Sequence, residues 1–253
     1  MKGFSLLTGL TRCVNTTNGK MTYGAFFEYG NGNDTGLYVT GARGKSDVYH
    51  YGGGVLGRLN FRNSVYAEGS FRAGGMDNGF TSNLLDIEGN AASYDSSSAY
   101  VGTHIGLGRV RKLSSRNTVD VYGKYFWTHQ GSDRVTLSTG DPVKFHSIDS
   151  HRLRFGGRSH YVVNRRLSTY LGAAWEHEFA GTARATTYGY AIDAPSLRGD
   201  TGIGELGVSV SRSARGALPS SARGVPLALD LGVQGYCGKR EGVAGSVQIR
   251  WAW

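Results

Sequence analysis

The sequence predicts an all-β fold, an antiparallel β-barrel that crosses a membrane, and three observations lead to this prediction. The first is composition: 253 residues contain 40 Gly, 15 Tyr and 10 Phe but only 4 Pro, which suits many strands joined by tight turns. The second is a repeated alternation of apolar and polar residues over long segments. The third is the connections between these segments, which alternate between short and long. No apolar run approaches the roughly 18 residues of a membrane-spanning helix.

Eleven segments show the alternation. They cover about 3–14, 19–30, 47–60, 63–75, 98–111, 117–129, 148–162, 166–179, 200–211, 225–238 and 242–253. A tilted strand needs about 9 to 11 residues to cross the hydrocarbon core of a bilayer, and each segment is long enough. Strands of globular proteins are typically about half as long as these segments.

The connections are asymmetric. Short turns are expected at "NTTNG", "FRN", "SSRN" and "NRR", and long loops at about 31–46, 76–97, 130–147 and 180–199. Short turns therefore lie at one end of the predicted barrel and long loops at the other, as in outer-membrane barrels, whose short turns are periplasmic. The stretch "RSARGALPSSARG" at 212–224 is longer than a periplasmic turn should be.

One face of each segment is apolar. If this face points outward, the outward rows are Phe4, Leu6, Leu10; Tyr23, Ala25, Phe27, Tyr29; Val101, Ile105, Leu107; Val119, Val121, Tyr125, Trp127; Leu153, Phe155, Tyr161; Leu171, Ala173, Trp175, Phe179; and Leu229, Leu231, Val233. Lys or Arg facing lipid at mid-bilayer costs about 2 to 4 kcal/mol, so charges are expected on the other face. Arg12 and Arg109 are outward exceptions at the short-turn ends, where long side chains reach water.

The opposite faces carry the charges that we expect to line the lumen. They are Glu28, Arg58, Glu68, Arg72, Asp120, Lys124, Arg152, Arg154, Arg158, Glu176, Glu178, Glu205, Asp230 and Arg250. Acidic and basic residues fall on successive strands, which suits an enclosed wet space. For Arg152, Arg154 and Arg158 two interpretations stay open: simple pairing with Glu176 and Glu178, or a charged wall that holds a pore helix or a translocating chain.

A soluble β-sandwich is the alternative to a membrane barrel, because its sheets also alternate. Aromatic residues favour the barrel. Trp127 and Phe179 lie toward the long loops, and Tyr161, Trp251 and Trp253 toward the short turns, as two interfacial girdles would. The C-terminal "SVQIRWAW" is then a last strand with Val247, Ile249, Trp251 and Trp253 facing lipid.

Other signals have structural explanations. The formal net charge of +9 is spread along the chain, so we expect no nucleic-acid partner. Cys13 and Cys237 fall on opposite faces and should not form a disulfide. "MKGFSLLTGL" lacks the features of a signal peptide.

Two motifs suggest chemistry that the pattern does not support. "GIGELG" at 202–207 matches a dinucleotide fingerprint but falls inside a strand, whereas the fingerprint needs a following helix. Asp149, Ser150 and His151 suggest a hydrolase, yet neighbouring strand residues point to opposite faces. His104, His129, His146 and His177 lack metal-ligand spacing. We therefore expect no catalytic residue, cofactor or metal.

Several longer stretches resemble a known family. They are "GAFFEYGNG", "VYAEGSFRAG", "VDVYGKYFWTHQGSDRVTLSTGDPVKF", "SHRLRFGGR", "AAWEHEF", "IDAPSLRGDTGIGELGVSVS" and the end from "LDLGVQGY" to "GSVQIRW". Together they resemble the C-terminal translocator of a type V autotransporter. The resemblance implies a twelve-stranded barrel, a helix in its pore and an N-terminal passenger. With eleven segments visible, residues 1–253 are interpreted as the barrel domain without its first strand, pore helix and passenger.

The function implied by the resemblance is export and anchoring of a passenger polypeptide at the bacterial outer membrane. The implied partners are outer-membrane lipid, the passenger and the barrel assembly machinery, which would recognise Val247, Ile249, Trp251 and Trp253. A small diffusion porin is the main alternative, and a barrel hydrolase is a third.

Overall fold

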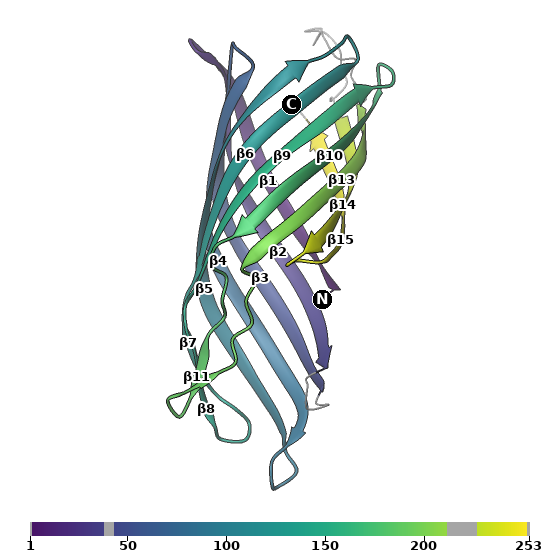
Figure 1. Ribbon diagram of the computed structural model, residues 1–253. Helices are drawn as coiled ribbons and strands as arrows, with labels where there is room; N and C mark the ends of the chain where they lie inside the picture. Colours follow the sequence, from purple (N-terminus) through teal and green to yellow (C-terminus); the bar gives the residue numbers. More distant parts are fainter. Residues whose placement is uncertain (1, 38–42, 212–226, 252–253) are drawn as a thin grey trace.

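The computed structural model describes residues 2–37, 43–211 and 227–251, which form an all-β structure (Figure 1). Eleven long strands build one antiparallel sheet in chain order: β1 (Lys2–Thr16), β2 (Gly19–Leu37), β3 (Arg43–Phe61), β4 (Val65–Leu85), β5 (Ala91–Lys112), β6 (Asn117–Gln130), β9 (Ile148–Val162), β10 (Leu167–Glu178), β13 (Gly199–Ser211), β14 (Leu227–Gly238) and β15 (Gly242–Trp251). The all-β, antiparallel fold and its eleven strands are confirmed.

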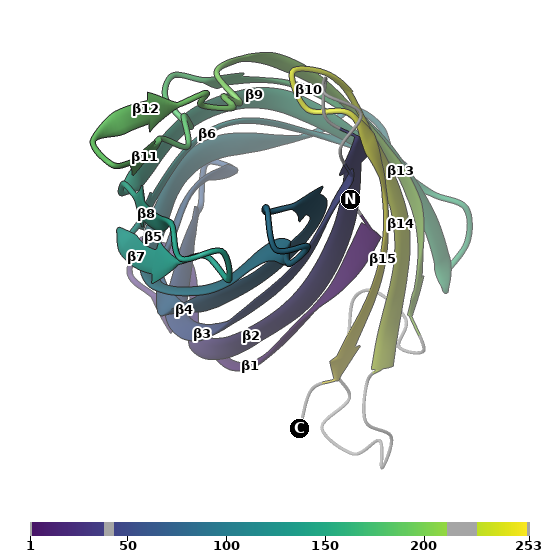
Figure 2. The same ribbon diagram turned by 90° about the horizontal axis from the view of Figure 1, so that it is seen from below.

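The sheet curls around a central space, with β1 and β15 at its two ends (Figure 2). Pairing is continuous between successive strands of the sheet, and the register shifts between Thr81 and Leu85 in the β4–β5 pair. Within the described residues β1 pairs only with β2, and β15 only with β14. The curled sheet is therefore open along one side.

Strands β2 to β5 are longer than the sequence suggested, with 19, 19, 21 and 22 residues. The expectation of loops over 31–46 and 76–97 was wrong for most of these residues, since ladder pairs such as Asn33 with Asp47 and Gly79 with Asp95 continue the hairpins. These stretches are mostly polar, and their few apolar residues, such as Phe80 and Tyr94, do not form a continuous apolar period. Their cross-strand backbone hydrogen bonds extend the sheet beyond its apolar band.

A second sheet lies at the long-loop end, where two further loops were expected. It consists of β12 (Tyr190–Ile192), β11 (Ala185–Thr187), β8 (Pro142–Phe145) and β7 (Asp133–Thr136), in that order. Strands of three or four residues are too short to show a period in the sequence. The sheet is joined to the barrel wall because the Ser97 amide donates to Asp133 Oδ2 at 2.8 Å.

The opposite end carries tight turns, as predicted. Thr17 and Asn18 join β1 to β2, and the β5–β6 and β9–β10 turns share one pattern. In the first, Ser114 Oγ accepts from the amides of Arg116 and Asn117; in the second, Asn164 Oδ1 accepts from those of Arg166 and Leu167. The stretch 212–224 lies outside the described residues.

The described residues include no helix that could cross a membrane. Cys13 and Cys237 are both free thiols, so the prediction that they do not bridge is confirmed. Cys13 lies on the edge strand β1 beside Thr22, and Cys237 lies on β14, next to the other edge strand, against Gly202.

Candidate functional site

The two faces of the sheet differ in a way that excludes a soluble sandwich. Along β2, Phe26 and Glu28 are buried on one face, while Phe27 on the other is 72% exposed. Ile105 and Leu171 are likewise 62% and 67% exposed on the apolar face. A soluble protein buries its apolar face, whereas this sheet presents it outward, as a lipid-facing wall does. The sandwich alternative is wrong.

The fourteen charged residues expected in the lumen all share the face opposite this apolar wall. Cross-strand pairs fix the assignment: Arg58 lies opposite Glu68, Lys124 opposite Arg154, and Arg154 opposite Glu176. Glu28, Glu176, Glu178 and Glu205 are buried there. Arg250, on the edge strand β15, is the exposed member of the set.

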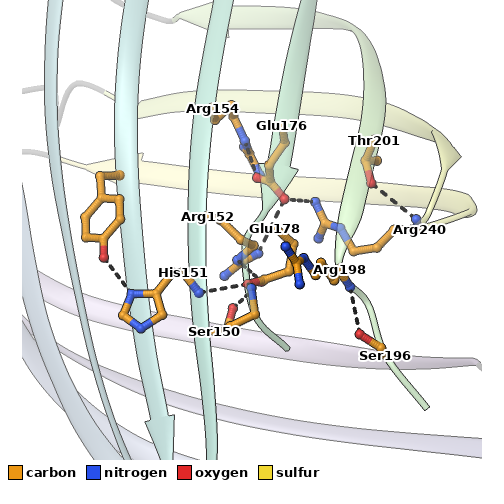
Figure 3. A network of polar contacts seen from close by, with 12 residues as sticks. Ser150, His151, Arg152, Arg154, Glu176, Glu178, Ser196, Arg198, Thr201 and Arg240 are labelled. Atoms are coloured by element: carbon orange, nitrogen blue, oxygen red, sulfur yellow. Dashed lines mark hydrogen bonds and ion pairs between the residues drawn. The ribbon is translucent and has the colours of Figure 1, made fainter. Parts of the chain in front are cut away.

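Glu176 is the centre of the densest cluster (Figure 3). Its side chain is 2% exposed and contacts three arginines. Arg154 donates to Oε2 from Nε at 2.7 Å and from Nη2 at 2.6 Å, Arg240 donates to Oε1, and Arg152 Nη1 lies 3.8 Å from Oε1. Arg240 comes from the turn between β14 and β15, so the cluster joins strands that are not neighbours. Nothing in the sequence pattern marked Arg240.

Glu178 is the next lumen-facing residue of β10 toward the long loops, and it forms a second set of contacts. Its carboxylate accepts from Ser150 Oγ at 2.5 Å and from the amides of His151 at 2.8 Å and Ala180 at 2.9 Å. Arg152 Nε lies 3.9 Å away, too far for a hydrogen bond. Arg152 thus faces two carboxylates, and among the described residues neither receives a hydrogen bond from its guanidinium.

Glu205 and Arg158 form a two-pronged pair. Nε and Nη2 of Arg158 each donate to a different carboxylate oxygen at 2.6 Å, and Gln234 adds a third donor at 3.1 Å. Paired parallel hydrogen bonds of this kind fix the orientation of the guanidinium.

Two more clusters lie on the same face, on strands β2 to β6. Glu28 accepts from Tyr100 OH at 2.5 Å and from Arg72 at 3.2 Å. Glu68 accepts from Arg58 at 3.2 Å and contacts Lys124 at 2.5 Å. The described buried side-chain polar atoms all have hydrogen-bond partners. The buried polar atoms of the charged face are therefore hydrogen-bonded, and Arg152 is a lumen-facing cation that stands apart from the short contacts.

Three tyrosines that the sequence did not single out reinforce this face, each crossing a neighbouring strand at a glycine. A Cβ at Gly108 would lie 2.4 Å from the ring of Tyr66, whose hydroxyl reaches Asp120 at 3.1 Å. Tyr170 covers Gly207 in the same way and reaches Asp230 at 3.2 Å.

The third, Tyr100, crosses Gly74 and Gly52 and reaches Glu28. The sequence signal for these contacts is a lumen-facing Tyr opposite a Gly on the next strand. It can be recognised only when the register between the two strands is known.

The motifs that suggested enzymes are separated by the fold. Asp149 contacts His129 and Trp127 on the outer face, while Ser150 donates to Glu178 on the inner face. "GIGELG" lies within β13, which continues as a strand to Ser211, so no helix begins at the motif. In the part of the chain that the structure describes, no three acidic, His or Cys residues are grouped as metal ligands.

Sequence comparison adds the family. The model of the autotransporter beta-domain matches residues 2–218, most of the chain. The chain belongs to the autotransporter beta-domain family. Among curated protein sequences none matches it.

Solved structures agree on the fold of this autotransporter β-domain. The transport unit of the autotransporter AIDA-I from Escherichia coli is 16% identical, with a TM-score of 0.69, over 98% of this chain and 81% of that one. The β domain of the Bordetella autotransporter BrkA is 18% identical, with a TM-score of 0.62, over 98% of this chain and 87% of that one.

Membership of this family gives the β-domain a cellular location and a role. Autotransporter β-domains are outer-membrane barrels of type V secretion that act on a passenger polypeptide, so the predicted localisation and translocator role are confirmed. On the terminal strand, Val247, Ile249 and Trp251 lie on one face and are 70%, 56% and 55% exposed. Trp253 lies outside the described residues.

Proposed function

We propose that this β-domain provides a hydrated, charge-lined conduit through which its passenger crosses the outer membrane in extended form, and to which the passenger stays anchored. The observation that supports this proposal is the satisfied ion-pair network on one face of a sheet whose other face is apolar and exposed. Such a wall keeps water at its surface, so a polypeptide passing along it keeps its backbone groups solvated.

Arg152 is the side chain that we assign to contact with the moving chain. It lies between Glu176 and Glu178 at 3.8 and 3.9 Å, while the neighbouring Arg154 and Arg158 are held at 2.6 to 2.7 Å. A guanidinium without short bonds can donate to passing carbonyl or carboxylate oxygens. Arg154 and Arg158 are instead structural, holding β9 to β10 and β13.

The proposal includes three further elements. Residues 1–253 form the barrel domain, and a twelfth strand, a pore helix and a passenger precede it. The assembly machinery recognises Val247, Ile249, Trp251 and Trp253 on the last strand. Lipid contacts the exposed apolar face. The mechanism contains no catalytic step and uses no cofactor or metal.

A surface-display experiment tests this function. The coding sequence, with the upstream frame and an epitope at its N-terminal end, is expressed in a Gram-negative host, and external protease is added to intact cells. The epitope should be cleaved while the barrel fragment remains in the outer membrane. A matched variant, Leu171→Glu, places a charge on the apolar wall and should abolish display. An epitope retained in the periplasm, together with uptake of small solutes, would instead support a porin.

A further inference from the structure

The short-turn end of the barrel carries basic residues that neither the fold nor the proposed conduit uses. This basic rim consists of Arg12, Lys20, Arg62, Arg109, Arg111, Lys112, Arg116, Arg165 and Arg166, all exposed. The acidic residues nearest to it are engaged on the lumen face: Glu68 by Lys124, Asp120 by Tyr66 and Asp230 by Tyr170. Among the described residues, no carboxylate neutralises the rim.

Two of these arginines continue a lipid-facing row. Ile105 and Leu107 are 62% and 64% exposed on the outer face of β5, and Arg109 and Arg111 follow on the same face. The residues opposite them are apolar: Val65 and Val121 for Arg109, and Val119 for Arg111. Within the described residues neither guanidinium has an ion pair or hydrogen bond.

Position along the strand places these guanidiniums at headgroup depth. Arg109 lies two residues beyond Leu107, which is about 7 Å along the strand. Leu113 and Val163, in the adjoining turns, are 63% and 42% exposed. Apolar and cationic groups thus meet at the short-turn end, where the hydrocarbon of the periplasmic leaflet gives way to its phosphates.

The two turns that share one hydrogen-bonding pattern enclose a matching hollow. It has a volume of about 570 Å³ and lies between the β5–β6 and β9–β10 turns. Ser114, Ser115, Arg116, Val163 and Arg165 line it from the turns, while Lys112, Thr118 and Val162 line it from the lumen-facing side of the strand ends. The two arginines and two serines of the turns are a donor set for phosphate oxygens, and Val163 is a contact for glycerol or acyl carbon.

From these observations we infer that the basic rim is a binding surface for anionic phospholipid in the periplasmic leaflet, with Arg109, Arg111, Arg116 and Arg165 as the phosphate contacts. A soluble acidic protein fits less well, because Arg109 and Arg111 extend the lipid-facing row and bilayer would cover their apolar neighbours. The surface fixes the depth and tilt of the barrel, since each bound headgroup resists vertical displacement of the turns.

The test uses the barrel produced with any upstream residues that its gene encodes, in nanodiscs of phosphatidylcholine alone or with 30% phosphatidylglycerol. The rim variant is Arg109→Gln, Arg111→Gln, Arg116→Gln and Arg165→Gln. The control, Arg134→Gln, Lys144→Gln, Arg184→Gln and Lys239→Gln, makes the same charge change at the long-loop end. Native mass spectrometry after detergent transfer measures retained phosphatidylglycerol relative to phosphatidylcholine, and heat-modifiable migration verifies folding.

The wild type and the control should retain phosphatidylglycerol selectively, and high salt should reduce the selectivity. The rim variant should lose about fivefold in retention for each arginine that contacts a headgroup, the factor corresponding to one basic side chain at an anionic surface. Equal retention by the rim variant and the control would overturn the inference. The inference would also be overturned if the wild-type rim bound acidic periplasmic protein in pure phosphatidylcholine discs and the rim variant retained as much phosphatidylglycerol as the wild type.

Discussion

Arg240, in the turn between β14 and β15, donates to Glu176 on β10 and so fastens the C-terminal hairpin to the wall across β13 (Figure 3). The same carboxylate is held by Arg154 from β9, on its other side. One buried glutamate therefore ties together the strand before it and the last hairpin of the chain. This link matters because β15 pairs on one side only within the described residues.

We expect Glu176→Gln to destabilise the barrel. The substitution leaves Arg154 and Arg240 beside a neutral amide, and losing a charged partner in a largely buried position costs about 1 to 3 kcal/mol. The temperature at which heat-modifiable migration is lost should fall. Arg250→Gln is the matched control, since Arg250 is an exposed lumen-face residue on β15. Unchanged stability in Glu176→Gln would show that the cluster does not hold the hairpin.

A pair of charge substitutions tests the two faces directly. Arg154→Glu puts a carboxylate next to Glu176 and should weaken the barrel or raise pore conductance, yet still allow insertion. Leu171→Glu places a charge on a side chain that is 67% exposed toward lipid, and should block insertion into the outer membrane. Membrane fractionation separates the outcomes. Similar behaviour of the two variants would contradict the face assignment.

The long strands could be predicted from the sequence because each shows its own alternation of apolar and polar residues. Apolar residues such as Phe27 and Leu171 repeat every second position, and lipid requires that repeat at every level of the wall. Beyond the apolar band lipid imposes no such repeat. The sequence therefore shows no alternation that would predict the extensions of β2 to β5 or the short strands β7, β8, β11 and β12.

The lumen contacts were harder to predict for a different reason. The face of Arg154 follows from alternation, but its partner depends on the register between strands, which one sequence does not fix. The contact between Arg240 and Glu176 spans 64 positions and passes over β13, the strand between β10 and the C-terminal hairpin. The contacts between tyrosines and glycines depend on register in the same way, since Tyr66 lies opposite Gly108 only in the observed register of β4 and β5.

The fit between Tyr66 and Gly108 gives a prediction of its own. Gly108→Val adds side-chain atoms where the ring of Tyr66 already lies, and overpacking of this kind costs about 1 to 3 kcal/mol. Tyr66→Ala combined with Gly108→Val should recover part of the loss, because it removes the clash. Thermal stability of the three variants in detergent gives the coupling. Additive losses would mean that the ring and the glycine do not act as a pair.

The last strand is expected to act during assembly. Removing Trp253, or changing Trp251 to Ala, should lower the yield of membrane-inserted barrel several-fold and leave more chain open to periplasmic proteases. Val243→Ala is the matched control, because Val243 is also exposed on β15, at 80%, but lies at its start. Equal yields for Trp251→Ala and Val243→Ala would argue against a terminal recognition signal.

The edges of β1 and β15, which have no neighbouring strand among the described residues, lead to a prediction about closure. β1 runs from the long-loop end toward the short turns, and so does β15, because nine strands lie between them in an alternating sheet. Direct closure would therefore pair two parallel strands, and an open edge in lipid leaves backbone amides without partners, at a cost of several kcal/mol for each. One additional strand running the opposite way would satisfy both edges. Residues 1–253 alone should consequently refold poorly into detergent, and an upstream extension of about 15 alternating residues should produce a closed barrel. Resistance to protease after refolding distinguishes the two chains, with an extension of shuffled sequence as control. A fully protected barrel from residues 1–253 alone would show that β1 and β15 close without a twelfth strand.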